Sequence, residues 1–300
     1  MARMTLRSRF PAIPAAVAAV ALLALPAAAQ QDFSAVEVTA EHVSGVVHML
    51  TGAGGNIGVS AGEDGILIVD DQFAPLADKI RAALKGISPG DLEFVVNTHF
   101  HFDHTGGNAI FGKEALIVAH TNVRKRLAEG AGVRGRPAEP APKEALPVVT
   151  YDDGVSIHFN GEEIMIGHLT GGHTDGDSYI YFTDSNVIHL GDQFFAGRFP
   201  FVDVGNGGNA VGLRDSIGEV LEHLPADAQV IPGHGPLSSV DDLKTYHRML
   251  TECVAAVKAG KEAGKSVEEI QAAGLPGEWS GWGSGFINES VFITSIHESL

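Results

Sequence analysis

Short apolar runs separated by glycine-rich turns recur along the first half of the chain. They are rich in Val, Ile and Leu, which is typical of buried strands. They cover residues 46–50, 65–70, 92–97 and 115–119. Between the second and third of these runs, Leu76, Ile80 and Leu84 recur at helical spacing. This spacing predicts an amphipathic helix with one buried face.

The second half repeats this plan. Strand-like runs lie near residues 155–159, 162–166, 178–183 and 186–190 and just before His234. Helices are expected near 210–224 and at about 240–259, the latter starting with a capping box at Ser239-x-x-Asp242. The Pro- and Ala-rich stretch 131–147 is the best linker candidate. Strands in both halves with helices outside them predict an α/β fold, an αββα four-layer sandwich of two similar halves.

A dense cluster of ligand-type residues follows the run 92–97. It reads His99-x-His101-x-Asp103-His104, with two glycines just behind it. Histidine is a common ligand of zinc, and a carboxylate adds a hard oxygen and a negative charge. His99 and His101 are two residues apart, so an extended segment projects them the same way. The alternative, a polar loop with solvated histidines, does not account for four ligands at this spacing.

Three more ligand-type residues follow later strand-like runs. His173 lies in a glycine-rich turn after residues 163–167, Asp192 ends the run from residue 186, and His234 follows Val230 and Ile231. Alone, each histidine is more often structural than a ligand. Together with the first cluster they make five histidines and two aspartates. That set is sufficient for two metals that share one bridging carboxylate.

The order of these motifs resembles the metallo-β-lactamase superfamily over roughly residues 45–260. In that resemblance Asp70, at the end of the run 65–70, supports the metal loop from behind the ligands. The resemblance implies the αββα fold and a class B β-lactamase-like hydrolase with two Zn²⁺ per chain, iron or manganese remaining open. It implies one metal held by His99, His101 and His173, the other by Asp103, His104 and His234, and Asp192 as the bridge. His189, three residues before Asp192, is a candidate to support the ligands from behind.

Such a centre indicates hydrolysis. Two metals about 3.5–4 Å apart lower the pKa of a shared water toward ~7 and polarise a carbonyl oxygen. Asp103 is then expected to orient the nucleophile and accept its proton. The substrate class is a small molecule with a C(=O)–N, C(=O)–O or C(=O)–S bond. A redox role at iron and a non-catalytic metal-binding module are the alternatives from other classes.

The N-terminus predicts export. Residues 1–29 have the form of a signal peptide, with three arginines before an apolar run and cleavage expected near Ala29-Gln30. The mature hydrolase domain would span residues 30–300, without a membrane span, in the periplasm or outside the cell. Loss of the three arginines takes the formal charge from −17 to −20, which argues against nucleic acid as a partner. Cys253, the only cysteine, falls on an apolar helical stripe and is predicted to be core.

The substrate is less well defined by the sequence. The seven-ligand set resembles that of hydroxyacylglutathione hydrolases and acyl-homoserine lactonases best. Asn206 lies in a Gly/Asn segment similar to one in lactamases that hold the lactam carbonyl oxygen, although a plain turn explains it equally well. Arg198 is a candidate to bind a substrate carboxylate, with a surface arginine as the alternative. Because β-lactams act in the periplasm, β-lactam ring opening is the leading prediction, and a lactonase or thioesterase is the alternative.

Overall fold

The first half of the chain forms one mixed sheet of seven strands in the order β1-β2-β3-β4-β5-β6-β7. The computed structural model describes residues 32–300, and the predicted signal peptide lies outside them. Strands β1 to β4 pair antiparallel, whereas β4 to β7 pair parallel. The strands are β1 (Thr39–Ser44), β2 (Val47–Thr51), β3 (Ile57–Gly62), β4 (Gly65–Val69), β5 (Leu92–Asn97), β6 (Leu116–His120) and β7 (Val149–Tyr151).

The second half forms a six-stranded sheet in the order β13-β12-β11-β10-β9-β8. Its neighbours pair antiparallel except β11 and β12, which are parallel. The strands are β8 (Gly154–Phe159), β9 (Glu162–His168), β10 (Ser178–Phe182), β11 (Val187–His189), β12 (Gln229–Ile231) and β13 (Ser238–Ser239).

Eight α-helices accompany the sheets within residues 32–300. They are α1 (Ala77–Ile87), α2 (Phe102–Thr105), α3 (Asn108–Phe111), α4 (Thr121–Glu129), α5 (Ala210–His223), α6 (Val240–Glu262), α7 (Val267–Ala273) and α8 (Glu289–Ser299). The capping box predicted at Ser239 and Asp242 is present at the start of α6. The 3-10 turns η3 (Gly191–Gln193) and η4 (Val204–Asn206) both lie in the segment between β11 and α5.

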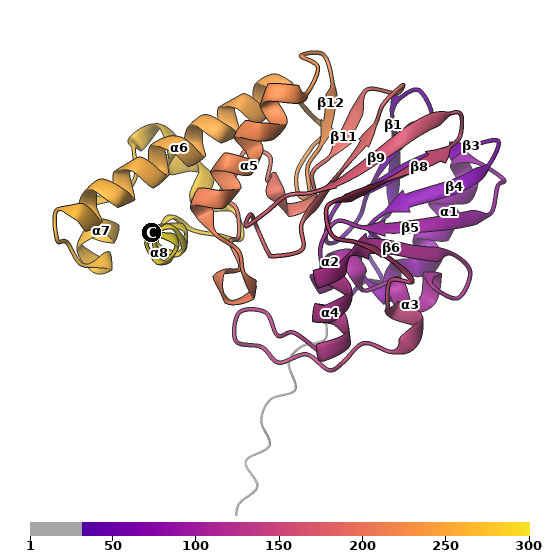
Figure 1. The fold of residues 1–300 in the computed structure, drawn as a ribbon, viewed down its shortest axis with the longest axis horizontal. Helices are drawn as coiled ribbons and strands as arrows, with labels where there is room; N and C mark the ends of the chain where they lie inside the picture. The colour runs from indigo at the N-terminus through magenta and orange to yellow at the C-terminus, as the bar shows by residue number, and fades with distance from the viewer. Residues whose placement is uncertain (1–31) are drawn as a thin grey trace, which may run out of the picture. The chain divides into compact units, whose positions relative to one another are not determined.

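The alternation of side chains along the strands separates the layers. In β4, Leu67 and Val69 face the second sheet in a core with Ile180 and Ile231. Ile66 and Ile68 point the other way and pack with the apolar face of α1. Because successive strand residues point to opposite faces, one strand contributes to both cores. Figure 1 shows the resulting arrangement of strands and flanking helices.

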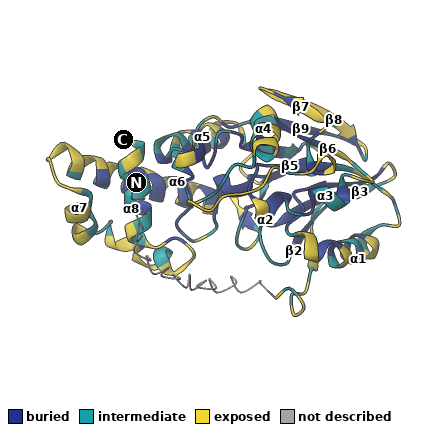
Figure 2. Ribbon diagram, turned by 90° about the horizontal axis from the view of Figure 1, so that it is seen from below, coloured by how far each residue is buried: buried dark blue, intermediate teal, exposed yellow. Residues whose placement is uncertain are grey.

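The outer face of the second sheet is covered by α5, α6 and α8. Their apolar residues form one cluster with Ile188 and Val230 of the sheet, and Cys253 is fully buried in it, as predicted. The sandwich αββα predicted from the sequence is therefore the observed fold. Figure 2 shows the buried strands between helices whose outward faces are exposed.

Two features differ from the sequence prediction. The stretch 131–147 does not separate the sheets, since β7 follows it and pairs with β6 in the first sheet. The C-terminal segment adds α7 and α8, which had no predicted counterpart. Residues 278–286, with both tryptophans, pack on the domain through Trp279, which is buried beside α6.

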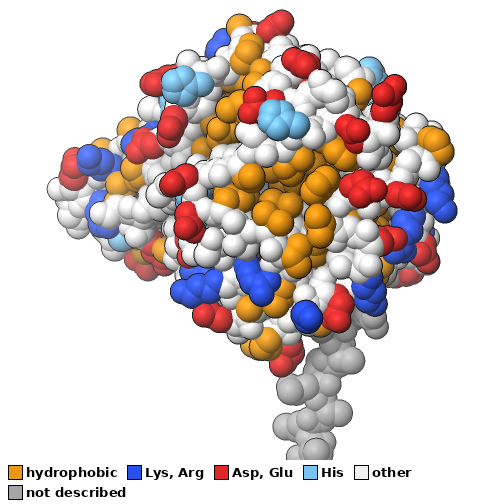
Figure 3. Space-filling view, turned by 45° about the vertical axis from the view of Figure 1, so that its right-hand side comes forward, with side chains coloured by type: hydrophobic (Ala, Val, Ile, Leu, Met, Phe, Trp, Pro, Cys, Tyr) orange, Lys and Arg blue, Asp and Glu red, His pale blue; other side chains and the backbone are white. Residues whose placement is uncertain are grey.

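The surface combines acidic groups with apolar ones. Figure 3 shows one face, where hydrophobic side chains gather in an area bordered by acidic and basic residues. Within residues 32–300, no helix is long and apolar enough to cross a bilayer.

Candidate metal centre

The ligand-type residues lie beyond the carboxyl ends of five strands at one edge of the sandwich. In the first sheet, β4 leads to Asp70 and β5 leads to the cluster that begins at His99. In the second, β9, β11 and β12 lead to His173, Asp192 and His234. A backbone hydrogen bond of 2.9 Å from Ser178 to the Thr98 carbonyl joins the two sheets at this edge. Sites gather at such strand ends in layered α/β folds.

One group of donors consists of His99, His101, His173 and Asp192, all buried, with one ligand atom of each within 4.8 Å of the others. His173 Nε2 lies 2.8 Å from His101 Nδ1. Asp192 Oδ2 lies 3.5 Å from His173 Nε2 and 3.9 Å from His99 Nε2. Three imidazole nitrogens and a carboxylate oxygen converge on one point, as a four-coordinate zinc site requires.

A second group consists of Asp103, His104 and His234. The other oxygen of Asp192 faces this group: Oδ1 lies 3.1 Å from His104 Nε2 and 3.3 Å from His234 Nε2. Asp103 Oδ2 lies 3.3 Å from His234 Nε2. Asp192 therefore stands between the groups with one oxygen toward each, which is the geometry of a bridging carboxylate.

Buried polar atoms without a hydrogen-bond partner indicate whether a metal ion would fit this site. His99 Nε2 and Asp192 Oδ1 are both buried and neither makes a hydrogen bond. A buried polar atom without a partner costs about 1–3 kcal/mol, so native proteins rarely leave one. Both atoms are among the converging donors, and a divalent cation would satisfy them. The nitrogen and oxygen donor set suits zinc and its neighbours in the first transition row. The residues present fit a metal centre.

Asp70 fixes the cluster from behind. Its Oδ1 accepts a hydrogen bond from the Thr98 backbone at 2.8 Å, and its Oδ2 accepts one from the Thr98 hydroxyl at 2.7 Å. The same Oδ2 lies 2.7 Å from His104 Nδ1. The partner of Nδ1 orients the ring and directs Nε2 toward the metal position. Asp70 adopts a φ of +65°, a conformation that Asp tolerates better than most residues.

Three other ligands are held in the same way. His99 Nδ1 lies 3.0 Å from the Thr98 hydroxyl. His101 Nε2 lies 2.9 Å from Asp203 Oδ2, and His173 Nδ1 donates to the Phe201 carbonyl at 2.7 Å. Asp203 and the role of the Phe201 carbonyl were missed in the sequence, because they share no motif or spacing with the ligands they touch; Phe201 itself was expected only as one of several phenylalanines that wall an apolar pocket after Asp192.

His189 positions two loops rather than a ligand ring. Its Nδ1 accepts from the Gly191 backbone at 3.0 Å, next to Asp192, and its Nε2 donates to the Asn56 carbonyl at 3.1 Å. The Asn56 amide in turn donates to the Pro232 and Gly235 carbonyls, both at 2.9 Å, which fixes the turn that carries His234. Asn56 had no signal in the sequence.

Asp177 organises the loop of His173. Its carboxylate accepts from the Thr174 backbone at 2.7 Å and from the Thr174 hydroxyl at 2.6 Å. It also accepts from Gln193 Nε2 at 2.5 Å, beside Asp192. One buried carboxylate thus ties together two loops that carry ligands of the same group.

A family comparison decides what kind of centre this is. The family model of the metallo-β-lactamase superfamily matches residues 50–234, a range that contains all seven ligand-type residues. The chain belongs to the metallo-β-lactamase superfamily. It is a metal-dependent hydrolase of that superfamily, as its relatives also indicate.

Curated relatives agree with this assignment, and solved structures share the fold. A probable metallo-hydrolase of Bacillus subtilis is 32% identical over 188 residues, covering 58% of this chain and 85% of the relative. A hydroxyacylglutathione hydrolase of Brucella anthropi is 31% identical over 183 residues, covering 57% and 60%. The DIM-1 metallo-β-lactamase structure has a TM-score of 0.60 at 20% identity, covering 72% and 98%. The structure of the sec-alkylsulfatase Pisa1 of Pseudomonas sp. has a TM-score of 0.66 at 18% identity. The match covers 87% of this chain and 50% of the alkylsulfatase chain.

The electrostatics of the superfamily centre differ between the two ligand groups. Burial lowers the pKa of His173 to about 4 and holds that of His99 well below its usual value. Burial also opposes protonation of His234, but the charges of Asp192 and Asp103 outweigh it and raise its pKa to about 9. Without metal at neutral pH, His99 and His173 are therefore uncharged imidazoles, whereas His234 holds a proton that a metal must displace.

The two predicted substrate-binding residues lie in different settings. The Asn206 amide is fully engaged: Nδ2 donates to Asp203 at 2.8 Å and to the Gly132 carbonyl at 2.9 Å, and Oδ1 accepts from Arg126 at 3.0 Å. Both of its N–H groups are used, so in this arrangement none is directed at a substrate oxygen. Arg198 lies in the loop after η3, and its side chain packs beside Gly285. A Cβ added to Gly285 would lie 3.5 Å from Cδ of Arg198.

Proposed function

We propose that the protein is an exported dinuclear zinc hydrolase of acyl bonds, with β-lactams as the leading substrates. The observation that carries the dinuclear assignment is Asp192, whose two oxygens face different ligand groups at 3.1–3.9 Å. A carboxylate placed in this way would hold a cation on each oxygen, as two-metal hydrolytic sites require.

Zinc ions bound there would activate water and polarise a carbonyl oxygen. The chain itself supplies position and a proton acceptor. Asp103 and His234 form the accessible side of the centre, with side chains 24% and 21% exposed, whereas the other ligand side chains are at most 5% exposed. Asp103 Oδ2 therefore stands where water and substrate arrive, and we assign it the roles of orienting the attacking water and accepting its proton.

Two candidate substrate classes have separate support. The signal-peptide pattern of residues 1–29 favours β-lactams, which act outside the cytoplasm. The second candidate, a thioester or lactone, is favoured by Asp192 as a bridging ligand and by similarity to a hydroxyacylglutathione hydrolase. Because the Asn206 amide is already engaged, we expect only slow opening of the lactam ring.

The test compares a chromogenic cephalosporin, an acyl-homoserine lactone and a hydroxyacyl thioester with one zinc-loaded preparation of residues 30–300. We expect chelator-sensitive turnover of the cephalosporin that is lost in His99→Ala. His158→Ala is the matched control, since His158 is an exposed histidine of β8 outside the centre. Turnover of only the lactone or the thioester would replace the β-lactam assignment. If protein with two zinc ions bound hydrolyses none of the three substrates, the proposal of a hydrolase for these substrate classes is overturned.

A further inference from the structure

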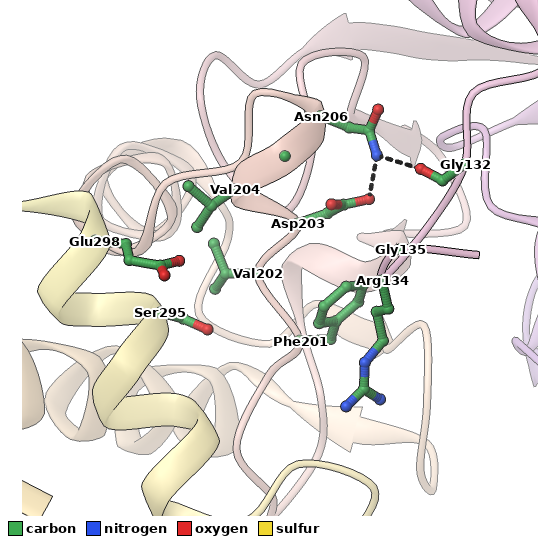
Figure 4. A pocket seen from close by; sticks show the side chains of 11 residues that line it. Gly132, Arg134, Gly135, Phe201, Val202, Asp203, Val204, Asn206, Ser295 and Glu298 are labelled. Carbon is green, nitrogen blue, oxygen red and sulfur yellow. Dashed lines mark hydrogen bonds between the residues drawn. The ribbon is translucent and has the colours of Figure 1, made fainter. Parts of the chain in front are cut away.

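A cavity of about 290 Å³ lies beside the metal centre. Its walls come from the loop around Arg134, from residues 201–206 and from Ser295 and Glu298 of α8. Figure 4 shows Arg134 next to the Phe201 ring, with the two α8 side chains across the cavity. Two residues of its wall also contact metal ligands: the Phe201 carbonyl accepts a hydrogen bond from His173, and the Asp203 carboxylate lies 2.9 Å from His101 Nε2.

Arg134 brings an unpaired positive charge to this cavity. Within residues 32–300 its guanidinium makes no hydrogen bond and no ion pair, and its contacts are with aromatic rings. Its Cζ lies 4.6 Å from the ring centroid of Phe286 and 5.5 Å from that of Phe201. These two rings meet edge to face, with centroids 6.3 Å apart. Cation–π contacts of this kind hold the guanidinium and leave its N–H groups free to donate.

The neighbouring arginine is not available in this way. Arg126 donates to both carboxylate oxygens of Asp175, at 3.2 Å and 2.7 Å, and to Asn206 at 3.0 Å. Its donors are committed to holding the loop that follows His173. Arg134 thus offers free donors at this end of the site, on a protein whose formal charge is −17.

Phe201 connects Arg134 to the metal ligands. Its ring centroid lies 5.5 Å from Cζ of Arg134, and it is 5.7 Å from the His101 ring, on which it stacks, and 5.6 Å from the His173 ring. One aromatic ring therefore contacts both the free cation and two ligands of the first group. A substrate that extends along this ring can place its reacting carbonyl at the metal centre and an anionic group at Arg134.

We propose that Arg134 is a specificity-determining residue that binds an anionic group of the substrate, such as a carboxylate, while Phe286 and Phe201 contact the apolar part beside it. A planar guanidinium fork matches the two oxygens of a carboxylate. Glu298 on the opposite wall disfavours a second negative charge, so the expected substrates are monoanionic acyl compounds. This inference rests on the proposed hydrolysis but not on the preference for β-lactams.

The test uses substrate pairs that differ only in charge. One pair is a chromogenic cephalosporin and its methyl ester; the other is the mono-4-nitrophenyl ester of glutaric acid and 4-nitrophenyl butyrate. The second pair reports on acyl hydrolysis whether or not lactams are opened. KM and kcat are measured on zinc-loaded wild type, Arg134→Ala, Arg134→Lys and Arg136→Ala. Arg136 is the matched control, an exposed arginine of the same turn that does not line the cavity.

In Arg134→Ala we expect KM for the anionic member of each pair to rise about tenfold more than for the neutral member, the loss of roughly one charge-assisted hydrogen bond. Arg134→Lys should restore part of this difference because it keeps the charge without the fork. Arg136→Ala should show no such difference. If Arg134→Ala loses the preference for the anionic ester while the cephalosporin is not hydrolysed by any form of the protein, the result supports the inference and overturns the lactam assignment. If KM in Arg134→Ala changes equally for both members of a pair that is hydrolysed, or if neither ester is hydrolysed at all, the inference is overturned.

Discussion

The side-chain amide of Asn206 donates a hydrogen bond of 2.8 Å to the carboxylate of Asp203. The same carboxylate oxygen, Oδ2, lies 2.9 Å from Nε2 of His101, whose Nδ1 is a ligand atom of the first group. Asn206 thus acts on the metal centre through Asp203. The oxyanion role expected from the sequence stays a prediction, and the positioning role has its own measurable consequences.

We predict that Asp203→Ala weakens zinc binding at the first group by about 10–100-fold, the usual effect of losing the group that orients a ligand imidazole. Asn206→Ala should weaken it less, because Asp203 stays in place. Competition with a chromophoric zinc chelator measures both. If Asn206→Ala lowers kcat while zinc affinity and the visible spectrum of the cobalt form are unchanged, Asn206 acts on the substrate instead.

Asp192→Asn should lose one metal. The substitution keeps the size of the side chain but replaces one oxygen by an NH₂ group, which cannot ligate, and removes the charge that both ligand groups face. We expect the zinc content to fall from two ions to one per chain and activity to fall by about 100-fold or more. Elemental analysis of dialysed protein is the measurement. Asp153→Asn, at an exposed aspartate in the turn before β8, is the control.

The two ligand groups should respond differently to pH. With a pKa of about 9, His234 is protonated at pH 7 without metal, so zinc must displace that proton. With a pKa of about 4, His173 is already neutral there. Raising the pH from 7 to 9 should therefore strengthen binding at the second group, whereas His173 of the first group has no proton left to lose over this range. Calorimetry in buffers of different ionisation enthalpy counts the protons released by each metal. Equal proton release at pH 7 would contradict the assignment.

Metal removal should destabilise the fold. The first group buries three histidines and an aspartate close together, and a cation bound there would join ligands from both sheets. Zinc at a thousand times its Kd stabilises a protein by ~4 kcal/mol, which corresponds to a rise in Tm of about 8–16 °C in a chain of this size. Differential scanning calorimetry before and after chelation, followed by return of zinc, measures it. A Tm that is indifferent to chelator would argue against a metal that links the sheets.

The sequence predicted the parts of the site that are local in the chain. His99, His101, Asp103 and His104 lie within six consecutive positions after a strand, and each remaining ligand follows its own strand, so spacing and strand ends were sufficient to find them. Asp203 and Asn56 were missed because they act across 102 and 176 or more residues, through contacts that no periodicity encodes. The same reason hid Arg134, whose partners Phe201 and Phe286 meet it only in the folded chain.

The pattern of apolar and polar residues predicted the fold wherever strands and helices were long. Strands such as Gly65–Val69 are buried on both faces and read as continuous apolar runs. The C-terminal helices α7 and α8 were not predicted, because their burial is decided by packing against α6. The stretch 131–147 had the composition of a linker, yet a three-residue strand after it completes the first sheet.

The dinuclear assignment is tested most directly by a crystal structure of the zinc-loaded protein with anomalous diffraction recorded at the zinc edge. We expect two anomalous peaks about 3.5–4 Å apart. One should be held by His99, His101 and His173, the other by Asp103, His104 and His234, with one oxygen of Asp192 on each. A single peak, or two peaks of which either lacks Asp192 as a ligand, would contradict it.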